Sequence, residues 1–307
     1  MKKICISIPC FNEERNINLI YQEVLKVTKK IKNIKFYFHF IDDCSSDNTW
    51  SRIKQIVKKN SNVSAHKFIV NHGKETALFS AINEVKDIDA MIFIDADLQH
   101  PPKIIPKLIN EWLKGHKVVA GRRVKDKFSL FRNLGSKFFY YLLNRFSEIK
   151  MQPYSTDFRI IDKTVISFLK NYKEQISFMR GLIDLIGFKV KYIDFSSDER
   201  TFGNSKFSFR YLFSLATSSF INFSLFPLRI VGYLGLLIST ISLLLLIFFV
   251  IYSSLISSDF NFITLLFLIS FIFMGLILAS LGLIALYIGN IHRETLGRPR
   301  YSIEEKI

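Results

Sequence analysis

Two long apolar runs near the C-terminus constrain the fold of this chain more than any other feature of its sequence. They extend from about Ile230 to Ile256 and from about Phe262 to Ile288, and neither contains a charged residue. A helix of about 27 residues reaches about 40 Å, which exceeds the roughly 30 Å hydrocarbon core of a bilayer. The sequence therefore predicts two transmembrane helices, and two such runs in succession disfavour the alternative, a buried hairpin of a soluble protein.

The charges beside these runs predict their orientation. The link Ser257–Asn261 contains no Lys or Arg, whereas Arg229 precedes the first run and Arg293, Arg298 and Arg300 follow the second. By the positive-inside rule the link lies outside. No signal peptide is recognisable at the N-terminus. We therefore expect a multi-pass protein of the cytoplasmic membrane whose N-terminal two-thirds and C-terminal tail are both cytoplasmic.

The net charge of +16 suggests an anionic partner, either nucleic acid or an anionic membrane surface. The two apolar runs favour the lipid bilayer, so no nucleic-acid partner is expected. Cys5, Cys10 and Cys44 are odd in number and their spacing fits no zinc site. Reduced structural thiols are the expectation.

Up to about Gly121 the chain alternates short apolar runs with helical patterns, which predicts βαβ units on a largely parallel sheet. No G-x-G-x-x-G follows the first run, and this counts against a dinucleotide-binding dehydrogenase. Strands are expected at 4–9, 36–41, 63–70, 90–94, 117–120, 158–161 and 189–195. Helices are expected at 14–30, 47–59, 74–85, 129–146 and 178–186.

The same patterns divide the chain into four parts. Residues 1–204 are expected to form an α/β domain, and residues 205–229, with Lys206 and Arg210 near their start, an interfacial amphipathic helix. Residues 230–289 would form the membrane hairpin. Residues 290–307 would form the tail.

Three loops rich in acidic residues follow three of the expected strands. After the apolar run 90–94 come Asp95, Asp97 and Gln99, which alternation along an extended backbone would place on one face. Their oxygen atoms suit Mg²⁺ or Mn²⁺. The alternative is a turn whose carboxylates cap a helix.

The other two loops are Pro9-Cys10-Phe11-Asn12-Glu13-Glu14 and Asp42-Asp43-Cys44-Ser45-Ser46-Asp47. Each alone can be interpreted as a capped helix start, with Asn12 as the N-cap of the first. Because parallel strands end at one sheet edge, where open α/β sheets bind ligands, three such loops indicate a site rather than coincidental capping.

In this order the three loops, together with the stretch from Asn71 to Leu78, resemble the family 2 glycosyltransferases. More narrowly they resemble the polyisoprenyl-phosphate glycosyltransferases, which include dolichol-phosphate mannose synthases and bactoprenol glucosyltransferases. The resemblance implies a GT-A type nucleotide-sugar-binding domain. Later stretches that fit the same group are Asp157-Phe158-Arg159, Arg180-Gly181-Leu182, Arg200-Thr201-Phe202-Gly203-Asn204-Ser205-Lys206, Phe226-Pro227-Leu228-Arg229 and Gly297-Arg298-Pro299-Arg300-Tyr301.

The family pattern implies roles for individual residues. The contacts to the donor nucleotide would be Pro9, Phe11, Glu13 and Asp43, with Asp42 supporting that loop and Asp95 reaching the donor as well. The ligands of the metal that bridges the diphosphate would be Asp95, Asp97 and Gln99, so that Asp97 also takes part in catalysis. The cations and hydroxyl that bind the acceptor phosphate would be Arg122, Arg132, Ser136, Arg200 and Lys206, with Arg123 and Lys137 as weaker candidates.

A general base is optional for such a reaction, because a phosphate oxygen is already ionised at neutral pH. Asp157 stands at the family's position for a base, and the alternative is a carboxylate paired with Arg159 or another arginine. Three positions depart from the pattern. Cys44 and Ala81 replace glycines, and His100 replaces an aspartate. A surface histidine beside a proline turn is expected for His100, with contact to the metal or donor as the alternative.

The resemblance implies a metal-dependent inverting glycosyltransferase that moves a hexose, from UDP-glucose or a similar nucleotide sugar, to undecaprenyl or another polyprenyl phosphate for cell-surface polysaccharide or protein modification. A GDP-mannose-dependent polyprenyl-phosphate mannose synthase is an alternative, as is a non-catalytic membrane subunit of a glycan assembly system. A processive synthase is disfavoured, because Trp50 and Trp112 stand in no Gln-x-x-Arg-Trp motif. Relatives in the group include oligomers, so the oligomeric state stays open.

Overall fold

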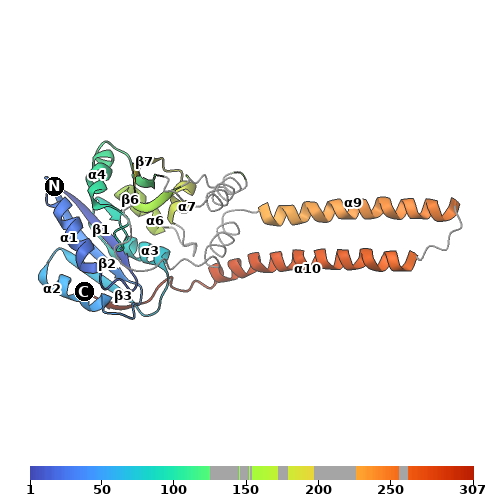
Figure 1. Ribbon diagram of the computed structural model, residues 1–307, viewed down its shortest axis with the longest axis horizontal. Helices are drawn as coiled ribbons and strands as arrows, with labels where there is room; N and C mark the ends of the chain where they lie inside the picture. Colours follow the sequence, from blue (N-terminus) through green and yellow to red (C-terminus); the bar gives the residue numbers. More distant parts are fainter. Residues whose placement is uncertain (125–144, 146–151, 153, 172–178, 197–225, 256–261) are drawn as a thin grey trace. The chain divides into compact units, whose positions relative to one another are not determined.

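The computed structural model describes residues 1–124, 145, 152, 154–171, 179–196, 226–255 and 262–307 (Figure 1). The chain divides into two compact units, one of Met1–Leu212 with Pro299–Ile307 and one of Phe213–Arg298. The predicted interfacial helix at 205–229 lies outside the described residues except for 226–229, which begin a long helix. The predicted helix at 129–146 also lies outside them, apart from residue 145.

The first unit is built on one sheet whose described strands number eight, in the order β7-β5-β6-β4-β1-β2-β3-β8. The strands are β1 (Lys2–Cys10), β2 (Ile34–Asp42), β3 (Val63–Phe68), β4 (Ala90–Phe93), β5 (Val118–Arg123), β6 (Ser155–Asp162), β7 (Val190–Phe195) and β8 (Ile303–Lys306). Strands β4, β1, β2 and β3 are parallel to one another, and β5 is parallel to β7. The mostly parallel α/β sheet is thus confirmed, with β6 and β8 as the antiparallel exceptions.

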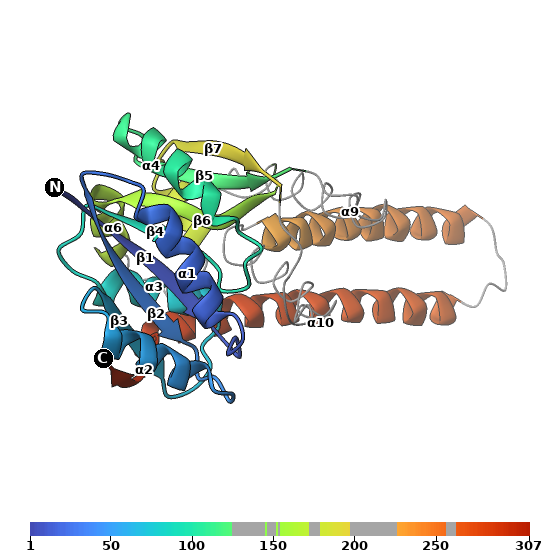
Figure 2. The ribbon, with the colours of Figure 1, turned by 60° about the vertical axis from the view of Figure 1, so that its left-hand side comes forward.

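Helices cover both faces of this sheet (Figure 2). One face packs against α1 (Ile17–Thr28), α2 (Thr49–Lys59) and α4 (Ile105–Leu113), the last preceded by the short 3₁₀ helix η1 (Pro102–Ile104). The other face packs against α3 (Lys74–Glu84), α6 (Lys163–Asn171) and α7 (Met179–Leu185). Helices α4 and α6 and strand β8 are additions to the sequence-based prediction.

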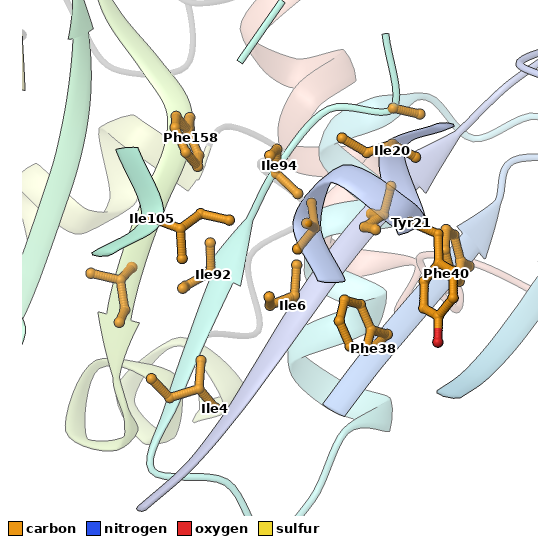
Figure 3. Packing of buried hydrophobic residues seen from close by; sticks show 14 of the residues in the cluster. Ile4, Ile6, Ile20, Tyr21, Phe38, Phe40, Ile92, Ile94, Ile105 and Phe158 are labelled. Atoms are coloured by element: carbon orange, nitrogen blue, oxygen red, sulfur yellow. The ribbon is translucent and has the colours of Figure 1, made fainter. Parts of the chain in front are cut away.

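Alternating side chains of the central strands form the two cores. Ile4 and Ile6 of β1 and Ile92 of β4 point to the face that α1 covers, where they pack near Tyr21 and Phe38 (Figure 3). This is the period-two pattern of a strand with both faces buried. On the opposite face Cys5 is fully buried. Burial raises the pKa of its thiol, in keeping with an unreactive structural cysteine.

The second unit contains two long helices, α9 (Phe226–Leu255) and α10 (Phe262–Thr295). Among the described residues, one stretch, Ile272–His292 in α10, is long and apolar enough to cross a membrane. One of the two predicted spans is therefore found as a candidate. Both helices match the predicted apolar runs in position and exceed them in length.

The chain does not end in a free tail. After α10, residues Ile303–Lys306 form β8 and pair antiparallel with β3 at the sheet edge (Figure 1). The N–H of Ala65 donates to the carbonyl of Ile307 over 2.7 Å, and the N–H of Ile307 returns a bond of 2.9 Å. The last residues therefore belong to the first unit and cover the edge of β3.

Candidate active site

Strand polarity brings the acid-bearing loops together. Strands β4, β1 and β2 are adjacent and parallel, so their carboxyl ends share one edge, as predicted. Strand β6 runs antiparallel beside β4, with Phe93 opposite Arg159. Continuing this register by two residues places Asp157 opposite Asp95. A carboxylate that lies far away in the sequence thus joins the predicted edge.

The backbone after β4 differs from the prediction. The strand ends at Phe93, and Leu98 adopts the left-handed region with φ +62°. The prediction that Asp95, Asp97 and Gln99 alternate on an extended backbone is therefore wrong, because the segment turns instead. A left-handed leucine costs free energy, and such conformations cluster at functional sites.

The ammonium group of Lys74 contacts two carboxylates of this edge, those of Asp95 and Asp157. The Nζ atom of Lys74 lies 2.7 Å from Oδ1 and 2.8 Å from Oδ2 of Asp95, and 3.0 Å from Oδ2 of Asp157. Burial lowers the pKa of Lys74, but its two acidic partners more than reverse this effect, so the pKa is raised overall. The lysine is firmly charged and neutralises part of the acidic edge.

Asp157 is buried and held on its other side by an arginine. Its Oδ1 lies 3.0 Å from Nε of Arg180. Burial raises the pKa of Asp157, but Arg180 and Lys74 outweigh it and the pKa is lowered. The pairing alternative is supported with Arg180 as the partner, whereas buried Arg159 donates to the carbonyl of Thr156. A carboxylate held this strongly in its ionised form is a weak proton acceptor.

Asp97 and Gln99 complete the stretch proposed to bind a metal. Asp97 is 7% exposed and its Oδ1 accepts the N–H of Gln99 over 3.1 Å. Oε1 of Gln99 lies 3.5 Å from Nη2 of Arg123. In the part of the chain that the structure describes, no group of three or more His, Cys, Asp and Glu is arranged to hold a metal ion. Asp95 and Asp97 offer two carboxylates, a donor set that fits Mg²⁺ or Mn²⁺ when waters and the phosphate oxygens of a substrate complete the coordination.

The loops after β1 and β2 are joined to each other by hydrogen bonds. The N–H of Asn12 donates to Oγ of Ser45 over 2.9 Å, and Oδ1 of Asn12 accepts the N–H of Ser46 over 2.8 Å. Helix α1 begins only at Ile17, with no side-chain cap. The interpretation of Asn12 as a simple N-cap is therefore wrong, and its side chain instead shapes the loop pair.

The predicted donor residues lie in this loop pair. Pro9 is the last residue but one of β1 and pairs with Ile41 of β2. The N–H of Glu13 donates to Oγ1 of Thr49 over 2.8 Å, and the Glu13 carboxylate accepts a hydrogen bond from Nδ2 of Asn16 over 2.6 Å. Phe11 lies between Pro9 and Glu13 in the sequence.

Asp42 and Asp43 have separate partners. Asp42 is fully buried and accepts the hydroxyl of Ser45, and burial raises its pKa. The carboxylate of Asp43 accepts the N–H of His72 over 2.7 Å and that of Gly73 over 2.9 Å. Gly73 has φ +86°, a conformation that suits glycine. Asp43 thereby fixes the turn that delivers Lys74 at the start of α3.

His100 is buried, and the expectation of a surface histidine is wrong. It is 3% exposed, and its ring stacks on Phe158 with centroids 5.2 Å apart and contacts Phe195 edge-on. Burial lowers its pKa. Its Nδ1 accepts the N–H of Asp95 over 3.3 Å, so a neutral ring supports the backbone at the first acidic residue.

The predicted acceptor residues are only partly described. Arg122 and Arg123 end β5, where Arg122 pairs with Asp194 and Arg123 approaches Gln99. The other predicted acceptor residues lie outside the described residues: Arg132, Ser136, Lys137, Arg200 and Lys206.

Sequence reasoning gave no role to Lys74, Arg180 or Glu75. One signal was available, because a lysine in the first turn of a helix is disfavoured by the helix dipole, and a nearby acidic partner would offset this cost. Oε2 of Glu75 accepts the N–H of Met179 over 3.0 Å, and burial together with Asp157 raises its pKa to about 7.

The fold and the edge define a GT-A-like α/β domain in which acidic loops gather where parallel strands end. Residues 5–169 match the model of the glycosyl transferase family 2. The chain belongs to this family and is a glycosyltransferase, which confirms the resemblance of its motifs.

Relatives match nearly the whole chain. A bactoprenol glucosyl transferase of Shigella phage SfX is 33% identical over 99% of this chain and 99% of its own length. The putative glycosyltransferase CsbB of Bacillus subtilis is 34% identical over 98% and 91%, and an uncharacterized glycosyltransferase of Synechocystis is 31% identical over 99% and 95%.

Solved structures share the fold of the first unit. Mannosyl-3-phosphoglycerate synthase from Rubrobacter xylanophilus superposes with a TM-score of 0.50 at 17% identity, covering 70% of each chain. Glucosyl-3-phosphoglycerate synthase from Mycobacterium tuberculosis gives 0.50 at 18% identity, covering 72% of this chain and 78% of its own. These likenesses support the GT-A-like fold.

Proposed function

We propose that the protein is an inverting glycosyltransferase that moves a hexose from a nucleotide sugar, UDP-glucose or a close analogue, to a polyprenyl phosphate. The observation that carries the proposal is that relatives named bactoprenol glucosyl transferases match 99% of the chain, and so match its apolar C-terminal helices as well as its acidic edge. A lipid-linked acceptor would explain why one chain combines apolar C-terminal helices with an acidic edge.

The acidic edge suits a reaction that releases a nucleoside diphosphate. A divalent cation held by Asp95 and Asp97, with Gln99 nearby, would stabilise the negative charge that grows on the leaving diphosphate. Pro9 near the end of β1, with the loop pair that carries Phe11 and Asp43, would position the nucleoside at the carboxyl ends of β1 and β2.

The acceptor phosphate needs positioning more than deprotonation. Its oxygen is already ionised at neutral pH, so direct displacement at the anomeric carbon requires no strong base. This agrees with the ion pairs that keep Asp157 ionised. Asp157 would hold Lys74 and Arg180 in place rather than remove a proton, while Arg122 and the basic residues beyond it would orient the phosphate.

The location of the enzyme is part of the proposal. We infer that α9 and α10 form a two-span hairpin in the cytoplasmic membrane, as their apolar sequences suggest. The first unit, which includes the C-terminal strand, would then face the cytoplasm, where nucleotide sugars are made. The interfacial helix proposed at 205–229 would connect it in the sequence to the rest of α9.

Sugar transfer to lipid tests the function directly. The purified full-length chain in detergent is incubated with undecaprenyl phosphate, Mg²⁺ or Mn²⁺ and radiolabelled UDP-glucose, and the lipid extract is counted. We expect a labelled lipid whose formation stops when EDTA is added or when Asp97 is changed to Ala. Transfer from GDP-mannose instead would assign the mannose synthase alternative, and transfer from no member of a panel of UDP- and GDP-sugars would contradict the proposal.

A further inference from the structure

The ammonium of Lys74 is bound to Asp95, a carboxylate that the proposed function requires for a divalent cation. This ammonium contacts both oxygens of Asp95, at 2.7 and 2.8 Å, and also reaches Asp157. An ion pair of this kind uses the same carboxylate oxygens that would bind a metal. Asp95, one of the residues that would hold the metal, is therefore already neutralised by a side chain of the protein.

The position of this lysine is built into the fold. It is the first residue of α3, follows the left-handed Gly73, and stands on a turn whose N–H groups bind Asp43. The positive end of the helix dipole lies here and disfavours a cation. The two carboxylates overcome this repulsion, so the ammonium is held by the acidic edge and not by its own helix.

A metal ion must compete with the ammonium for Asp95. Mg²⁺ and Mn²⁺ bind carboxylate oxygens at about 2.0–2.2 Å, and an ammonium 2.7 Å from the same oxygen repels a cation there and uses one of the lone pairs that it would bind. If the metal takes Asp95, the ammonium loses its nearest counter-charge. The lysine then needs a new anion within reach of α3, and a diphosphate bound to the same metal supplies one.

Resting on the proposed function, we propose that Lys74 is an exchangeable counter-ion. In the donor-free enzyme it neutralises Asp95 and Asp157, and when metal and nucleotide bind together it leaves Asp95 for the diphosphate while Asp157 keeps it in position. The metal alone then binds weakly, because it must displace a paired ammonium. Metal and nucleotide bind cooperatively, and by linkage each strengthens the other by the same factor.

The coupling also connects the two ends of the donor site. Asp43, a predicted nucleoside contact, holds the turn of His72 and Gly73, and the next residue is Lys74. A nucleoside that settles against this turn therefore affects the backbone that carries the counter-ion. The nucleoside end of the donor and its diphosphate end are thereby coupled through the turn that runs from His72 to Lys74.

Direct measurement of Mn²⁺ binding tests this inference without sugar transfer. Free Mn²⁺ is titrated by electron paramagnetic resonance against the full-length protein in detergent, with and without UDP or GDP. We expect Lys74→Met to bind Mn²⁺ alone more tightly than the wild type, on the order of tenfold, and to gain less from the nucleotide. Lys74→Arg keeps a cation and should behave as the wild type does.

Lys163→Met is the matched control. Lys163 pairs with Asp89 at 3.5 Å near the other end of β4, so its loss removes one paired ammonium without changing the acidic edge. Its Mn²⁺ affinity should equal that of the wild type. If Lys74→Met binds Mn²⁺ no more tightly than the wild type does, the counter-ion role is wrong.

Mn²⁺ binding by the wild type, measured with and without nucleotide, tests the inference even if Lys74→Met does not fold. Mn²⁺ binding that is equally tight with and without nucleotide would overturn the cooperativity on which the inference depends. Normal nucleotide-dependent Mn²⁺ binding together with an unchanged Lys74→Met would reject Lys74 and leave the proposed function intact. Failure of both UDP and GDP to bind, with no sugar transfer, would reject the proposed function itself and the inference with it.

Discussion

Arg122 and Asp194 form a two-pronged ion pair between neighbouring strands, with Nε 2.6 Å from Oδ1 and Nη2 3.0 Å from Oδ2. They lie directly opposite each other in the parallel register of β5 and β7. An arginine fork binds a carboxylate and a phosphate with the same geometry. Asp194 thus occupies the donors that the proposed acceptor phosphate would use.

Removal of this carboxylate should improve acceptor binding. We expect Asp194→Asn to lower the KM for undecaprenyl phosphate several-fold, because Arg122 is released, and Arg122→Gln to raise it about tenfold, the loss of one charged hydrogen bond. Both side chains are more than 40% exposed, so each change should alter the stability by about 1 kcal/mol at most. Steady-state kinetics with varied acceptor lipid measure the effect. An unchanged KM in Arg122→Gln would place Arg122 outside the acceptor site.

Gly121 is required where β5 passes beside two aromatic residues. A Cβ atom there would lie 2.7 Å from Cε1 of Phe195 and 3.3 Å from the carbonyl oxygen of Phe158. We expect Gly121→Ala to destabilise the first unit by about 1–3 kcal/mol, the usual cost of overpacking a core. Thermal unfolding of the purified protein measures this. Adding Phe195→Leu should recover part of the loss, and failure to do so would locate the strain elsewhere.

The sequence predicted the central strands and the acidic edge because both are local patterns. Apolar runs that end in Asp42 and Asp95 identify β2 and β4, and parallel pairing then brings their ends together. For the stretch after β4 the sequence analysis followed the extended backbone and kept a turn only as the alternative, since neither Leu98 nor its neighbours signal a left-handed residue. Turn geometry there depends on packing against the core, which a local pattern does not contain.

The parts that escaped prediction depend on distant partners. Strand β8 reads Ile-Glu-Glu-Lys and has too little apolar character to be recognised, yet Trp50 and Lys54 of α2 bind Glu305, and Lys67 binds Glu304. The ion pair of Lys74 with Asp157 likewise depends on the antiparallel register of β6, which begins some 80 residues later in the chain. Contacts of this kind are set by topology and cannot be read from spacing.

A buried chain of two histidines should make the first unit sensitive to acid. Nε2 of His39 lies 2.9 Å from Nδ1 of His66, and serine hydroxyls of Ser64 and Ser80 bind the outer nitrogens. Burial lowers the pKa of His39 to about 3 and that of His66 to about 4.

The sign of the pH dependence follows from these shifts. An unfolded histidine has a pKa of about 6.5, so the unfolded chain binds more protons than the native state below that pH. The two buried histidines cost no stability above about pH 6.5. Below this pH the free energy of unfolding falls by about 1.4 kcal/mol per histidine for each pH unit, until the pH reaches about 4. The melting temperature should therefore decrease between pH 7 and pH 5, and less steeply in His39→Gln. A flat profile would mean that the histidines are not buried in neutral form.

The C-terminal strand should contribute to the stability of the catalytic unit, even though it follows α10 in the chain. The ring of Tyr301 stacks on Phe68 with centroids 5.5 Å apart, and its hydroxyl donates to Glu84 over 3.0 Å. Loss of this aromatic contact in Tyr301→Ala should cost about 1–3 kcal/mol and uncover the edge of β3. Tyr301→Phe keeps the stacked ring and should lose only the hydrogen bond, about 1 kcal/mol. Hydrogen exchange of β3 amides in the full-length protein measures the difference: faster exchange in Tyr301→Ala than in Tyr301→Phe is expected, and equal exchange in the two variants would mean that the stacked ring does not hold β8 on the sheet.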